Sequence, residues 1–222
     1  MALARRVLIG FANVAVTIIL FFAPAGTLKF WQAWVYVFVM AAASAMIVAY
    51  LRQKDPKLLE RRARGPGAEK EMSQKLLHLF AILVFAGAVV LSSYDHRFSW
   101  SHVPLFVEIA GYALVTLGFC IYFVVFRENT FGGATIEVVS DQRVITTGPY
   151  AIVRHPMYSG LLVLLFGTPL ALGSWWGLLM LVPMALVVAS RIRYEERFLT
   201  TNLPGYTDFC RKVRYRVLPL IW

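Results

Sequence analysis

The run LFVEIAGYALVTLGFCIYFVVF at residues 105–126 carries only one charged side chain, Glu108. A helix needs roughly 20 apolar residues to cross the hydrocarbon core of a bilayer, and this run is long enough. Other apolar runs follow the same pattern and occupy residues 7–23, 30–51, 76–91, 157–172 and 175–189. Together they predict an all-α integral membrane protein with about five to six transmembrane helices.

The composition of the chain supports this class. Hydrophobic residues make up 59% of the sequence and charged residues only 15%, whereas an ordinary soluble domain carries roughly 25% charged residues. A soluble all-α protein with buried helices is therefore a much weaker interpretation. The last two apolar runs are the short ones, and we expect them to form a short helical hairpin joined at Gly173–Ser174.

The basic residues are distributed unevenly between the loops. All but two of the 22 lysines and arginines lie at the N-terminus or in residues 52–75, 127–158 and 191–222; Lys29 and Arg97 are the exceptions. Cytoplasmic loops of membrane proteins are enriched in Lys and Arg. This pattern predicts that both termini, the basic loop 52–75 and the C-terminal region are cytoplasmic. Membrane topology thus explains the net charge of +10, and we expect no nucleic-acid partner.

The chain divides at about residue 126. Residues 1–126 are expected to form four transmembrane helices, the first of them a retained helix rather than a cleaved signal peptide. Loop 52–75 contains a possible short amphipathic stretch at Pro56–Arg64, and we interpret the loop as a solvated linker that lies on the membrane surface. Residues 127–222 are richer in polar residues, glycine and proline, so function is expected there. Two cysteines, Cys120 and Cys210, predict no disulfide framework.

Two clusters precede the fifth apolar run. Residues 142–145 are short and extended in character and lead into a Thr-Gly-Pro turn at 147–149, which is equally typical of an ordinary loop. His155 then precedes Pro156, a residue suited to the first position of a helix. The free amides and positive dipole at that helix end would attract an anion such as a carboxylate. Membrane anchoring by Arg154 and His155 is the competing interpretation.

A third cluster ends the sixth apolar run. Arg191 and Glu195 are four positions apart and Arg193 and Glu196 three, so each pair can share a helix face. Acidic groups beside a membrane helix are costly unless they are paired or functional. Helix-end salt bridges and a catalytic site therefore both remain open. The tail after residue 203 mixes aromatic and basic residues, which suits either an interfacial anchor or a lid.

The combined pattern resembles a known family. Gly148-Pro149-Tyr150, Arg154-His155-Pro156-Met157-Tyr158, a hydrophobic hairpin, Arg-x-Arg-x-Glu-Glu at 191–196 and Leu-Pro-Gly-Tyr at 203–206 resemble the isoprenylcysteine carboxyl methyltransferases. That family belongs with the membrane methyltransferases that include phospholipid N-methyltransferases. The resemblance covers residues 127–222 and makes this region the expected methyltransferase core.

The resemblance implies an S-adenosylmethionine-dependent enzyme with a cytoplasmic cofactor site and a lipophilic acceptor that enters from the lipid bilayer. By the motif match, Glu195 would contact the cofactor and Arg191 would face the acceptor. On chemical grounds, Arg191 or Arg193 could orient an acceptor carboxylate, and an amine acceptor would give Glu195 or Glu196 the role of a base. Glu137 stands where relatives tend to have glutamine. The remaining implied cofactor contacts are Gln142, Arg143, Val144, Ile145, Tyr150, His155, Pro156, Met157 and Tyr158.

The acceptor itself is not readable from the sequence. A carboxylate is already ionised at neutral pH, its pKa being about 4, and needs no strong base, which favours carboxyl methylation of a prenylcysteine-like or other lipidic substrate. An amine acceptor, as in phospholipid N-methylation, would have to lose a proton. A nicotinamide-dependent membrane reductase of the sterol-reductase type and a non-enzymatic membrane scaffold are two competing functional interpretations. No metal site is expected, and no feature of the sequence indicates an oligomeric state.

Overall fold

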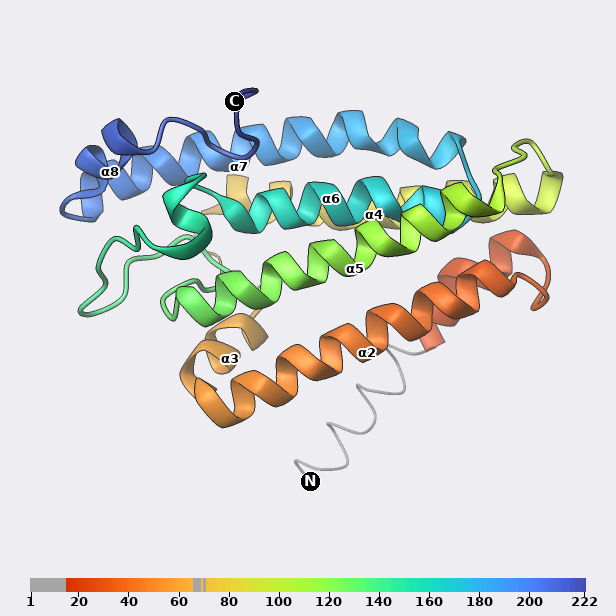
Figure 1. Cartoon of the computed structure of the whole chain (residues 1–222), viewed down its shortest axis with the longest axis horizontal. Coiled ribbons are helices and arrows are strands. Elements are labelled where there is room, and N and C mark those ends of the chain that lie inside the picture. Colours follow the sequence, from red (N-terminus) through yellow and green to blue (C-terminus); the bar gives the residue numbers. More distant parts are fainter. Residues whose placement is uncertain (1–14, 66–68, 70) are drawn as a thin grey trace.

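The structure is a computed structural model that describes residues 15–65, 69 and 71–222. Every regular element in these residues is helical, as the sequence predicts (Figure 1). An apolar helix, Ala15–Ala25, comes first. It is followed in chain order by α2 (Trp31–Lys54), α3 (Pro56–Ala63), α4 (Met72–Phe98), α5 (Leu105–Glu128), η2 (Gly148–Ala151), α6 (Pro156–Ala171), η3 (Trp176–Met180), α7 (Leu181–Asn202) and α8 (Tyr206–Lys212).

Four of the described helices are long and apolar enough to cross a membrane by length and composition: α2, α4, α5 and the continuous segment formed by η3 and α7. Ala15–Ala25 and α6 are apolar but shorter. These helices define a multi-pass membrane protein. The predicted run at residues 7–23 lies partly outside the described residues, so only its second part is seen.

The predicted hairpin is formed by α6 and α7, and only its first arm is short. Gly173 adopts a positive φ of 70° at the turn, and the Ser174 hydroxyl donates a hydrogen bond to Asp95 Oδ2 at 2.5 Å. With 16 residues, α6 is about 24 Å long at about 1.5 Å per residue. The second arm continues to Asn202. The prediction of a short second arm is wrong because the charged residues after position 189 find partners and the helix continues through them.

Glycines set the distance between α5 and α6, which run antiparallel along most of their length (Figure 1). A Cβ added to Gly111 would overlap the backbone nitrogen of Ala171, and one added to Gly118 would lie 2.9 Å from the Gly160 carbonyl oxygen. Small residues at such contacts let membrane helices approach until their backbones touch. The contact holds the first residues of α6 beside the last turns of α5.

Within the predicted linker at 52–75, residues 55–63 are instead folded onto the bundle. Asp55 caps α3 by accepting a hydrogen bond from the Leu58 amide at 2.9 Å. Leu58 is buried in a cluster with Leu51, Val125 and Phe126, which ties α3 to the ends of α2 and α5. The interpretation as a solvated linker is wrong for this stretch because its apolar face has a tertiary partner that the local sequence does not reveal.

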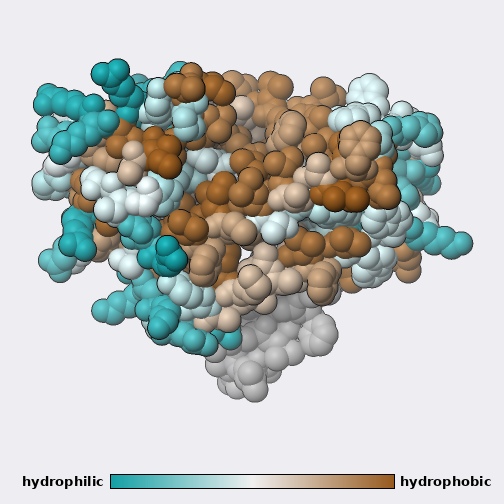
Figure 2. Space-filling view, viewed as in Figure 1, coloured by the Kyte–Doolittle hydropathy of each residue, from teal (hydrophilic) through white to brown (hydrophobic). Residues whose placement is uncertain are grey.

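Hydrophobic residues form a broad band across the middle of the molecule, with hydrophilic residues at both ends (Figure 2). The end that carries α3, α8 and the 129–147 connection is the more hydrophilic one (Figures 1 and 2). The three basic segments 52–75, 127–158 and 191–222 meet at this end, since Arg62 and Arg191 contact residues from the other segments. Their cytoplasmic orientation stays a prediction.

Candidate functional site

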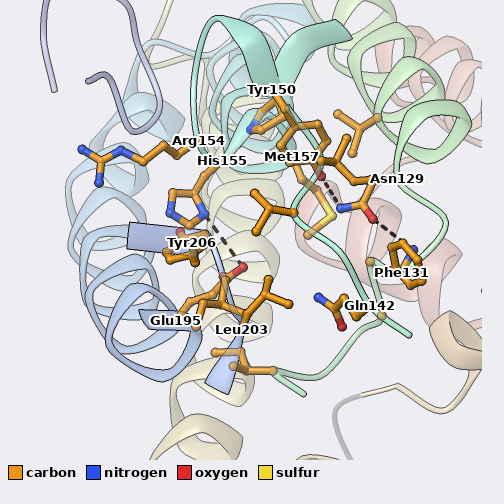
Figure 3. Close-up of a pocket in the computed structure, with 18 of the residues that line it drawn as sticks. Asn129, Phe131, Gln142, Tyr150, Arg154, His155, Met157, Glu195, Leu203 and Tyr206 are labelled. Carbon is orange, nitrogen blue, oxygen red and sulfur yellow. Dashed lines mark hydrogen bonds and ion pairs between the residues drawn. The ribbon is translucent and has the colours of Figure 1, made fainter. Parts of the chain in front are cut away.

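A cavity lies at this end of the bundle, between the end of α5, the start of α6, and α7 and α8 (Figure 3). We call it the first cavity. All ten residues predicted to contact the cofactor line it: Gln142, Arg143, Val144, Ile145, Tyr150, His155, Pro156, Met157, Tyr158 and Glu195. The fold therefore brings residues 142–158 together with α7, although the sequence separates them by a hydrophobic hairpin.

The start of α6 has the geometry expected from Arg-His-Pro. His155 is the residue before the helix and Pro156 the first residue within it. The amides of Arg154 and His155 donate hydrogen bonds to the carbonyl oxygens of Tyr215 and Arg216, at 2.9 and 2.8 Å. The C-terminal tail is thus bonded along the turn that carries His155, and it supports one wall of the cavity.

Glu195 brings a carboxylate from α7 to the first cavity. It accepts a hydrogen bond from the Tyr158 hydroxyl at 2.9 Å, and its Oε1 lies 3.8 Å from His155 Nδ1. Figure 3 shows the Glu195 carboxylate pointing toward the His155 ring. Glu195 also lines a neighbouring cavity, so this residue contributes to the walls of both cavities.

Glu196 faces a different direction from Glu195. It accepts hydrogen bonds from Arg154 Nη1 at 2.7 Å and from Arg216 Nε at 2.9 Å, with His155 Nε2 at 3.4 Å. Arg193 is exposed. The expected Arg193–Glu196 pair is absent from the described ion pairs, and neither residue lines the first cavity. Glu196 instead joins α6, α7 and the tail, because three donors from outside its own helix reach it.

Arg191 is paired with a residue from the N-terminal half of the chain. Its Nη2 donates to Glu69 Oε2 at 2.7 Å and its Nη1 to Gln74 Oε1 at 3.1 Å. Arg191 is only 8% exposed and Glu69 only 3%. The shared-face pair with Glu195 does not form in the described structure, because the buried guanidinium is saturated by these tertiary partners.

A second cavity adjoins the first, and six residues line both: Gly133, Thr135, Ile136, Met157, Tyr158 and Glu195. Its other walls come from α3, α4 and α7 and from the 129–147 connection. The residues that line only this cavity are Arg62, Gly65, His78, Ala134 and Arg191. The second cavity thus places Arg191 next to the first cavity, though not in it.

Three residues at these cavities were not singled out in the sequence: Asn129 and Phe131 line the first cavity and Arg62 the second. Tyr206, the last residue of the Leu-Pro-Gly-Tyr motif, also lines the first cavity, although no cofactor contact was predicted for it. Glu137, where relatives tend to have glutamine, also lines the first cavity.

Two tyrosines of the first cavity keep their protons at physiological pH. Burial raises the pKa of Tyr150 to about 12, and its hydroxyl oxygen accepts a hydrogen bond from Asn129 Nδ2 at 2.8 Å. Burial and the nearby Glu195 raise the pKa of Tyr206 as well. The Tyr206 hydroxyl is buried without a hydrogen-bond partner among the described residues, so it remains available to a bound molecule.

These features define a multi-pass membrane protein with a polar cavity at one end of its helical bundle. Within that class, residues 106–204 match the model of the phospholipid methyltransferase family. The matched region is somewhat less than half of the chain, and it agrees with the resemblance, seen in the sequence, to the membrane methyltransferase group that includes isoprenylcysteine carboxyl methyltransferase-like proteins. The match begins earlier than expected, at the start of α5, and ends before α8.

Curated relatives match part of the chain. A delta(14)-sterol reductase of Mus musculus is 28% identical over 109 residues, which cover 44% of this chain and 25% of the reductase. The nickel-cobalt-cadmium resistance protein NccN of Alcaligenes xylosoxydans xylosoxydans is 27% identical over 111 residues, covering 49% of this chain and 46% of that protein. The chain thus spans less than half the length of either relative. Among the described residues, no group of three or more His, Cys, Asp or Glu side chains is placed to hold a metal ion.

Proposed function

We propose that this protein is an S-adenosylmethionine-dependent methyltransferase that modifies a lipophilic acceptor entering from the membrane. The observation that carries the proposal is the first cavity itself. The ten residues that the motifs predict as cofactor contacts line one space, and Glu195 reaches it from α7, the second arm of the hairpin. The family match over residues 106–204 supports the same class of reaction.

The groups around the first cavity suit this cofactor. S-adenosylmethionine, when bound, supplies an electrophilic methyl group on a positively charged sulfur. The Glu195 carboxylate would bind the cationic amino-acid end, and the unpaired Tyr206 hydroxyl would satisfy one of its polar atoms. Apolar side chains of Phe126, Val144 and Leu199 would surround the adenine and exclude water.

We propose carboxyl O-methylation of an isoprenoid, prenylcysteine-like or other lipidic acid. Transfer to a carboxylate forms an oxygen–carbon bond, breaks the sulfur–methyl bond and leaves the electron pair on sulfur. No proton moves, so the site's task is to align the acceptor and exclude water. That suits a site in which Glu196 is held by Arg154 and Arg216 and is not free to act as a base.

Phospholipid-type N-methylation is the second candidate, and the description of the matching family favours it. Glu195, which lines both cavities, would then accept the proton of the ammonium group. A nicotinamide dinucleotide would bring two phosphates into the first cavity. Of the described arginines there, Arg154 is neutralised by Glu196 and only Arg143 is unpaired, so a reductase is less well supported.

Glu195→Gln is expected to weaken S-adenosylmethionine binding by about 10- to 100-fold, because a hydrogen bond to a charged group contributes about 1.5–3 kcal/mol. Isothermal titration of the purified protein measures this directly. Glu71→Gln, at an exposed position, is the matched control and should leave the affinity unchanged. Binding of NADPH without binding of S-adenosylmethionine would replace the methyltransferase proposal by the reductase.

We also propose that the cavity end faces the cytoplasm, on the basis of the basic loops. In a Cys210→Ser background, Thr201→Cys reports the cavity end and His102→Cys the opposite end; both positions are exposed. A membrane-impermeant maleimide should label position 102 in intact cells and position 201 only after lysis. Labelling in the reverse order would overturn the orientation.

A further inference from the structure

Arg62 brings a half-buried cation to the wall of the second cavity. It lies in the last turn of α3, which is pinned to the bundle through Leu58. Its Nη1 donates to the carbonyl oxygens of Gly133 at 3.0 Å and Gly132 at 3.3 Å and lies 3.4 Å from Met157 Sδ. The guanidinium also stacks over the Phe126 ring, 4.4 Å from its centroid. Every one of these partners is electrically neutral.

No carboxylate compensates this charge. Arg62 forms no ion pair among the described residues, and the segments outside them, residues 1–14, 66–68 and 70, contain no Asp or Glu. Burial lowers the pKa of Arg62, but an arginine side chain stays protonated in proteins. Removing a charge from water without giving it a partner is costly even where burial is only partial, which favours an anion beside Arg62.

The other arginine that lines the second cavity, Arg191, already has hydrogen-bond partners within the protein. Glu69 and Gln74 together use both Nη atoms of Arg191. Arg62, in contrast, uses only Nη1 in the described hydrogen bonds. Its Nη2 and Nε make no described hydrogen bond, and because Arg62 lines the second cavity, they are the atoms of this guanidinium left to bind an anion there.

We propose that Arg62 binds the oxyanion headgroup, a carboxylate or a phosphate, of the lipophilic acceptor in the second cavity. This inference rests on the proposed function and names the acceptor subsite within it. Arg62 lines only the second cavity, whereas Met157, Tyr158 and Glu195 line both. An anion on Arg62 would thus lie beside the space assigned to the cofactor and outside it. A guanidinium holds either oxyanion through two parallel hydrogen bonds.

The test uses three probes with the same hydrocarbon chain: oleate, oleyl phosphate and the neutral oleamide. They are titrated into the purified full-length protein in a neutral detergent. We expect the wild type to bind at least one of the two anions about tenfold or more tightly than oleamide. The anion that binds better identifies a fatty-acid-like or a phospholipid-like headgroup, and either supports the proposal if the preference depends on Arg62.

Arg62→Met should remove the preference for the anion. Arg62→Lys keeps the positive charge and should retain part of the preference, which distinguishes loss of the charge from loss of folding. Arg64→Met is the matched control. Arg64 follows α3 immediately, is exposed, and lies 3.7 Å from Glu60, so its loss should leave the preference intact. A wild type without anion preference, or an Arg62→Met protein that keeps it, overturns the proposal.

Titration of the same samples with S-adenosylmethionine separates this inference from the proposed function. We expect wild type and Arg62→Met to bind the cofactor equally. If Arg62→Met loses cofactor affinity but keeps the anion preference, Arg62 holds the cofactor instead and the inference fails. If the wild type binds no cofactor yet shows an Arg62-dependent anion preference, the methyltransferase proposal fails while the anion site stands.

Discussion

Arg191→Ala is expected to lower the free energy of unfolding by about 3–5 kcal/mol, the usual cost of removing one partner from a buried ion pair. Glu69 would be left as an uncompensated carboxylate that is 3% exposed. Thermal unfolding in detergent measures the loss. Arg193→Ala, two positions along the same helix but exposed, is the control and should change the midpoint little.

The double variant Arg191→Met with Glu69→Leu distinguishes a structural pair from an acceptor-binding cation. Replacing a buried pair with apolar groups is often neutral, so most of the lost stability should return. If methyl transfer returns as well, Arg191 positions the N-terminal segment and does not touch the acceptor. An Arg191→Ala protein of wild-type stability but without activity would contradict this and restore the direct role implied by the family resemblance.

Gly111→Ala is expected to destabilise the bundle by about 1–3 kcal/mol or more, because overpacking against backbone atoms cannot be relieved by a side-chain rotation. The added Cβ would overlap the backbone at Leu170 and Ala171. Gly87→Ala is the matched control, since its Cβ would lie 3.5 Å from the flexible Met180 sulfur, an ordinary contact. Both changes give a similar gain in helix propensity, so the difference in thermal midpoint isolates the clash.

The Gly111 substitution should also reach the site. Separating α5 from α6 displaces His155 relative to Phe126, and both residues line the first cavity. We therefore expect weaker S-adenosylmethionine binding in Gly111→Ala but not in Gly87→Ala. Equal stability and equal cofactor affinity in the two variants would show that the helices tolerate a wider spacing.

Local patterns determined the class of protein and the composition of the first cavity. Hydrophobic runs such as residues 105–126 predict membrane-spanning helices. Lipid offers the backbone no hydrogen-bond partners, and a helix satisfies its backbone groups internally. Pro156 placed the start of α6 correctly, since proline suits a position whose amide would be unpaired. The residues that the family resemblance predicts as cofactor contacts line one cavity, since most of them lie within residues 142–158.

Only the tertiary structure decided the partners of the charged side chains. Arg191 meets Glu69 across 122 positions and Arg62 meets Gly133 across 71, whereas the sequence suggested a pair between Arg191 and Glu195, four residues apart. Periodicity describes which residues share a face of one helix, but it carries no information about which other segment packs there. A buried charge is paired by whatever the fold brings within reach, and that depends on helix contacts such as those at Gly111 and Gly118, which no local pattern encodes.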